Sequence, residues 1–186
     1  MNRIYIFFQM SCLGLLMVFS SCETTDLDIT EDPNALGANQ ASVDLFLNSI
    51  QRDYGKFIAE VEDDASEAVR ILNYVDGTYQ EHFGGPTNFD TQWQDAYQGI
   101  LQDIKTMNAI AVNTETGSDQ AIHVEMGQVL EAYVIVTLVE LFGDVPYREA
   151  LQGEENLNPA VTPGADIYSD AMALLDAAIV SFNRNI

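Results

Sequence analysis

The chain has 186 residues, of which 47% are hydrophobic and 10% are aromatic, so it can bury a substantial core and is not a disordered acidic tail. Its formal charge is -22, which argues against nucleic acid as a partner because an acidic surface repels phosphate. The length suits one domain or a piece of a larger one.

Residues 1–21 have the composition of an export signal. Arg3 precedes a largely apolar segment over residues 4–19, and two serines follow it. We expect this segment to be cleaved and to take no part in the fold. Cys22 comes directly after the serines, as in a bacterial lipoprotein signal whose cysteine sulfur is acylated. The alternative is an ordinary secretory peptide with an incidental cysteine. Cys12 would leave with the signal, so no disulfide is expected.

Residues 22–41 carry acidic residues, proline and glycine without a sustained period, which predicts a lipid-anchored tether. Apolar residues then recur at intervals of three and four residues over residues 43–61, which predicts a helix with Ser42 as its N-cap. Asp64 and Glu67 indicate the start of a second, shorter helix that would end at Gly77. Acidic residues gather at this junction, and we interpret them as a solvated surface rather than a catalytic cluster.

Residues 76–90 form the longest loop that carries aromatic side chains. Exposed rings on a glycine-rich loop can stack on the apolar faces of sugars, and loops on rigid scaffolds commonly carry binding. The candidate ligand contacts are therefore Tyr79, His82, Phe83 and Phe89. The alternative is that these rings fold inward and close the end of a helical pair.

A third helix is expected over residues 90–112, with Trp93 on its apolar face and so in the core. Ser118 is the expected N-cap of a fourth helix. His123 and Glu125 within it resemble half of a zinc deaminase signature, but no Cys-x-x-Cys follows and the chain has two histidines. We predict no metal, no cofactor and no catalytic residue.

The fourth helix continues into residues 129–142, which are almost all apolar and predict a core helix surrounded by others. The run is too short and too charged to cross a bilayer, which needs about 20 apolar residues. Gly143 can close the helix in a left-handed conformation, and Pro146 cannot continue it. A fifth helix is expected from residue 165 to residue 186. It lacks a stop signal, which suggests that the chain is broken off there.

Five expected helices and no run of alternating apolar residues predict an all-α fold of antiparallel helix pairs. Some aromatic and alanine groupings are typical of tetratricopeptide helices. However, the expected helix starts do not keep the period of about 34 residues. The prediction is therefore a degenerate tetratricopeptide-like α-solenoid scaffold.

The segment before the first expected helix reads ITEDPNALGANQAS and contains the element Asp32-Pro33-Asn34. A second segment reads AYVIVTLVELFGDVPYREAL, in which several constraints coincide. Together with the lipoprotein-type start, these segments resemble the SusD/RagB family of outer-membrane lipoproteins, and the Asp32-Pro33-Asn34 element is similar to one SusD-like subgroup. The hallmark residues of the second segment, to which we assign an architectural role, are Gly143, Asp144, Pro146 and Tyr147. Members of the family are longer, so residues 42–186 are expected to be the N-terminal part of the helical domain.

The resemblance implies a lipid-anchored protein on the outer face of the outer membrane. Such a protein binds a glycan or another nutrient, delivers it to a SusC-type TonB-dependent transporter and catalyses nothing. Two alternatives stay open at this point. One is a secreted all-α glycoside hydrolase or lyase that uses two of the carboxylates, and the other is a helical-repeat adaptor without a ligand.

Overall fold

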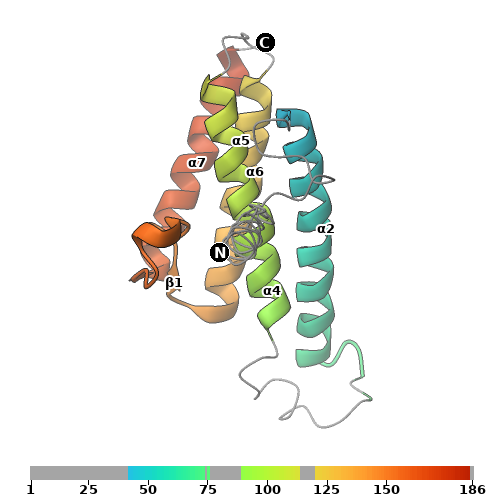
Figure 1. Ribbon diagram of the computed structural model, residues 1–186. Helices are drawn as coiled ribbons and strands as arrows, with labels where there is room; N and C mark the ends of the chain where they lie inside the picture. The colour runs from blue at the N-terminus through green and yellow to red at the C-terminus, as the bar shows by residue number, and fades with distance from the viewer. Residues whose placement is uncertain (1–41, 74, 76–88, 114–119, 185–186) are drawn as a thin grey trace, which may run out of the picture. The chain divides into compact units, whose positions relative to one another are not determined.

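The described part of the chain is all-α, as the sequence predicts (Figure 1). The structure is a computed structural model that describes residues 42–73, 75, 89–113 and 120–184. These residues belong to one unit, Ala38–Ile186. The expected signal segment, the tether and Cys22 lie outside the described residues.

Four helical rods make up the described part of the fold, together with a short irregular segment between the last two. The elements are α2 (Val43–Ala68), α4 (Asp90–Gln94), the π-helix η1 (Asp95–Leu101), α5 (Gln102–Asn113), α6 (Ala121–Phe142), β1 (Val145–Pro146), the 3-10 helix η2 (Gly153–Glu155), β2 (Val161–Thr162) and α7 (Gly164–Arg184). α4, η1 and α5 follow one another without a break and form the second rod. Each rod runs opposite to the one before it, so neighbours in the chain are antiparallel (Figure 1).

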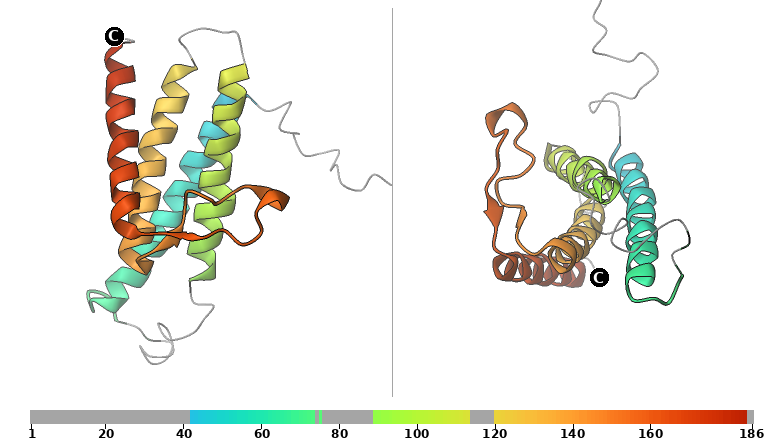
Figure 2. Two further views of the ribbon diagram at one scale, coloured as in Figure 1. Left: turned by 90° about the vertical axis from the view of Figure 1, so that its left-hand side faces the viewer. Right: turned by 90° about the horizontal axis from the view of Figure 1, so that it is seen from below.

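Helix α6 is the centre of the arrangement. It contacts α2, η1, α5 and α7, and the end-on view shows α2 and α7 on opposite sides of it (Figure 2). Its buried side chains include Ala132, Val134, Ile135 and Leu138, each at most 2% exposed. α6 is thus the core helix that the apolar run predicts.

One helix in the described part, α6, is long and apolar enough to cross a membrane by length and composition alone. The apolar run of residues 129–142 is too short to cross a bilayer, but the helix that contains it has 22 residues because it begins at Ala121. Its contacts with helices on several sides, and the burial of Glu125 against the hydroxyl of Ser181, are those of a core helix.

The prediction of two helices between Ser42 and Gly77 is wrong. The side chain of Ser42 accepts the N–H of Leu45, as expected, but α2 then runs through Asp64 to Ala68 as one helix. No proline interrupts this stretch, its one glycine, Gly55, lies well before Asp64, and a capping-box pattern alone does not end a helix.

The helix ends instead in a Schellman motif. The N–H of Arg70 donates to the carbonyl of Glu67, and the N–H of Ile71 donates to that of Ser66. Arg70 has a φ of 62°, in the position that glycine usually occupies. Val69, Leu72 and Val75, in the stretch that was expected to form the second helix, are exposed.

The expected helix over residues 90–112 is present, but it contains the π-helix η1, which the sequence analysis did not predict. Trp93 is partly buried and packs against the core, as expected. Its ring stacks on Tyr97 with centroids 5.2 Å apart, and it also contacts Phe142 at 4.8 Å. The expected N-cap of the fourth helix, Ser118, lies outside the described residues.

Candidate functional site

The turn after α6 is built from the hallmark residues. The N–H of Gly143 donates to the carbonyl of Val139 at 2.8 Å and closes the helix. Gly143 has the positive φ that was predicted, 79°, but its ψ of -120° lies outside the left-handed helical region, in backbone space that favours glycine. Oδ1 of Asp144 accepts the N–H of Gly164 at 2.9 Å. The turn therefore joins the end of α6 to the start of α7.

A short antiparallel ladder holds the segment between these two helices. Val145 pairs with Thr162, and both residues are buried. Oγ1 of Thr162 accepts the N–H of Arg148 at 3.2 Å. The Arg148 guanidinium binds both carboxylate oxygens of Asp170, at 2.8 and 3.0 Å, and lowers the pKa of that carboxyl. The segment is fixed to α7 by its backbone and by an ion pair.

Two tyrosines fix the same segment to the other helices. The hydroxyl of Tyr97, in η1, donates to the carbonyl of Pro146 at 2.6 Å. The hydroxyl of Tyr147 donates to Oε1 of Glu131, in α6, at 2.8 Å. Burial raises the pKa of both tyrosines, and the Glu131 carboxylate raises that of Tyr147 further. Both hydroxyls therefore stay protonated at neutral pH and remain hydrogen-bond donors.

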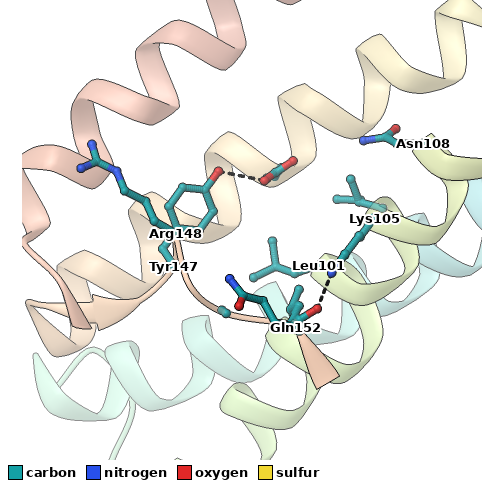
Figure 3. A pocket seen from close by; sticks show the side chains of 10 residues that line it. Leu101, Lys105, Asn108, Tyr147, Arg148 and Gln152 are labelled. Carbon is teal, nitrogen blue, oxygen red and sulfur yellow. Dashed lines mark hydrogen bonds between the residues drawn. The ribbon is translucent and has the colours of Figure 1, made fainter. Parts of the chain in front are cut away.

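A pocket of about 510 Å³ lies between α5, α6 and residues 147–152 (Figure 3). Its apolar lining consists of Leu101, Ile104, Ala150 and Leu151, and its polar lining consists of Lys105, Asn108, Glu131, Tyr147, Arg148 and Gln152. The ammonium of Lys105 donates to the carbonyl of Leu151, which joins α5 to the segment across the pocket. The pocket therefore has a mixed polar and apolar surface, and a hydrogen bond joins two of its walls.

The sequence profile described as "Starch-binding associating with outer membrane", of the SusD-like family, matches residues 33–186. The chain belongs to the SusD-like family. The matched residues include the hallmark turn and every residue that lines the pocket. No curated protein sequence matches the chain. SusD-like proteins are binding proteins rather than enzymes.

The structure describes one of the four predicted aromatic-loop contacts. Phe89 is partly buried, and its ring meets Phe142 edge to face with centroids 5.4 Å apart. Tyr79, His82 and Phe83 lie outside the described residues. Ligand binding by these four residues stays a prediction for this SusD-like chain.

The hallmark residues lie together at the junction of α6 and α7, and Tyr147 also lines the pocket. Lys105, Asn108 and Gln152 carry no local pattern and were not predicted from the sequence. Glu131 did carry a signal, because it is one of few polar residues in an apolar run. A carboxylate at such a position needs a hydrogen-bond partner, and Tyr147 supplies it.

The two residues considered for a zinc site, His123 and Glu125, bind partners on different helices. Nε2 of His123 lies 2.6 Å from Oδ1 of Asp44, in α2, and Glu125 accepts from Ser181, in α7. Among the described residues, no group of three histidine, cysteine, aspartate or glutamate side chains could hold a metal ion.

The burial of Glu131 leads to a pH-dependent prediction. Burial raises its pKa above the ordinary value of 4.5, and the bond from Tyr147 opposes this shift in part. A carboxyl whose pKa is raised by folding contributes stability at pH values below its unfolded pKa, and this contribution is lost as the pH rises through the folded pKa. We expect Glu131→Gln, which keeps an acceptor for Tyr147, to be more stable than the wild type at about pH 7 and equally stable at about pH 4 or below.

Urea denaturation across this pH range checks the result. Glu154→Gln, at an exposed position in η2, is the matched control for the loss of one surface charge, and the gain at Glu131 should exceed any change that it causes. A Glu131→Gln variant that is less stable than the wild type at neutral pH would show that the charged form is the one that the fold prefers.

Proposed function

We propose that this protein is a lipoprotein of the outer membrane that faces the cell exterior, binds a glycan and delivers it to a SusC-type TonB-dependent transporter. The observation that carries the proposal is the match to the SusD-like family over residues 33–186. The export signal and Cys22 support the anchor, because an acylated cysteine would hold the mature protein at the membrane.

The fold suits a capture role. Antiparallel helices around α6 form a rigid support, and loops that such a support holds in place lose little entropy when they bind a ligand. In the proposal, the loop that carries Tyr79, His82, Phe83 and Phe89 grips the sugar. Aromatic rings stack on the apolar faces of sugars, and the contact between Phe89 and Phe142 places one end of that loop against the end of α6.

Calorimetry of the full-length protein with starch oligosaccharides tests this function. We expect Tyr79→Ala and Phe89→Ala each to weaken binding by about twofold to tenfold, since a ring contact contributes about 0.5–1.5 kcal/mol. Tyr168→Ala, at an exposed position on α7, is the control and should bind as the wild type does. Unchanged affinity in both loop variants would rule out the loop as the sugar contact. Release of reducing ends by the purified protein would favour a hydrolase instead.

A further inference from the structure

We propose that the pocket between α5, α6 and residues 147–152 is a second subsite, which binds one ring of an uncharged sugar. The class of ligand rests on the proposed function, whereas the location and the preference for an uncharged ring come from the pocket itself. The hallmark residue Tyr147 would then contribute to a ligand site as well as to the architecture of the turn.

The size and lining of the pocket suit a small polar ligand. Its volume of about 510 Å³ lies within the range of about 300–1,000 Å³ that is typical of ligand sites. Leu101, Ile104 and Leu151 offer an apolar surface to the carbon atoms of a ring. Figure 3 shows Tyr147 on one side and Asn108 on the other, so polar groups approach the same space from different elements.

The hydrogen bonds inside the protein show which polar groups are left for a ligand. Arg148 is bound to Asp170, Lys105 is bound to the carbonyl of Leu151, and the hydroxyl of Tyr147 is bound to Glu131.

Within the described residues, Oδ1 of Asn108 is buried without a hydrogen-bond partner. The side chain of Gln152 is exposed and has no hydrogen-bond partner among the same residues, and only one oxygen of Glu131 accepts a bond there. Two amides and one carboxylate oxygen therefore keep unused hydrogen-bonding capacity within the described residues, and the Gln152 amide is the exposed one.

These remaining groups match hydroxyls better than they match acids. An amide both donates and accepts, and a carboxylate accepts, so together they can satisfy hydroxyl groups that donate and accept. A ligand carboxylate would face Glu131 in the pocket and a chain with a formal charge of -22 around it. The two cations of the lining already have partners, and this favours an uncharged ring over an acidic one.

The π-helix η1 is a separate observation that points to the same place. Single-turn π segments inside α-helices occur frequently at functional sites. η1 ends at Leu101, which lines the pocket. It also contains Tyr97, whose hydroxyl donates to the carbonyl of Pro146, the residue before Tyr147 of the pocket lining. One irregular segment therefore positions part of the pocket surface and the backbone next to it.

NMR titration of the full chain, labelled with 15N, with methyl glucoside tests the subsite. The side-chain amide signals of Asn108 and Gln152, assigned from Asn108→Ala and Gln152→Ala, should shift as the ligand saturates. Each variant should weaken binding by about twofold to tenfold, because a hydrogen bond contributes about 0.5–1.5 kcal/mol. Asn158→Ala, at an exposed position in the same segment, is the control and should not change the affinity. Methyl glucuronide, the acidic counterpart, should bind at least about tenfold more weakly.

The outcomes separate this inference from the proposed function. If starch oligosaccharides bind but the two amide signals do not move, the pocket is not a subsite and the proposed function stands. Equal binding of methyl glucuronide would overturn the preference for an uncharged ring. Gln152 is exposed, so a loss of binding in Gln152→Ala with an unchanged melting temperature would not be an effect on folding.

Discussion

Replacing Ile135 by alanine should lower the free energy of unfolding by about 2–5 kcal/mol. Ile135 is 1% exposed and lies in α6, which contacts helices on several sides. The shorter side chain would remove apolar contacts and leave a cavity that the surrounding helices fill only in part. Urea denaturation, followed by the far-ultraviolet circular dichroism of the helices, would measure the loss.

The matched control is Ile179→Ala in α7. Ile179 is 57% exposed, so its truncation leaves no cavity and should change the free energy of unfolding by less than about 0.5 kcal/mol. Equal losses at the two positions would contradict the assignment of α6 as the core helix.

Replacing Gly143 by alanine should lower the free energy of unfolding by about 1–3 kcal/mol. The φ of 79° and ψ of -120° are strained for any residue with a Cβ atom. A Cβ atom added at this position meets nothing within 4 Å, so steric clash with neighbours does not contribute. The expected loss is therefore backbone strain alone, and thermal and urea denaturation would both detect it.

Gly55→Ala is the matched control for this change. Gly55 lies inside α2, and a Cβ atom added there also meets nothing within 4 Å. Alanine is the better helix former, so this variant should gain about 0.5–1 kcal/mol. A loss of stability in both variants would show that the effect at Gly143 does not come from its unusual backbone angles.

The sequence predicted the parts of the fold that depend on strong local signals. The apolar run of α6 and the glycine and proline that follow it predicted a core helix and its end, and both predictions are confirmed. The end of α2 was not predictable in this way. Arg70 takes a positive φ without being glycine, and the acidic residues before it suit either a helix interior or a helix start.

The candidate site was predictable only where its residues form a motif. The hallmark turn was recognised because glycine, aspartate, proline and tyrosine follow one another in a fixed order. The pocket was not, because its walls come from α5, α6 and the segment before α7. Asn108 and Gln152 are ordinary polar residues of a helix and a loop, and only the fold brings them to one cavity.

The π-helix η1 corrects the phase of the rod that contains it. Gln92, Ala96, Ile100 and Ile104 are all buried, although they are spaced by four residues. In a regular α-helix each such step overshoots a full turn by about 40°, so three steps would carry the last side chain about 120° away from the first. The wider turn of η1 offsets this drift. The loss of one residue from Asp95–Leu101 would therefore rotate α4 relative to α5, and Gln92 would no longer face the interior while Ile104 does.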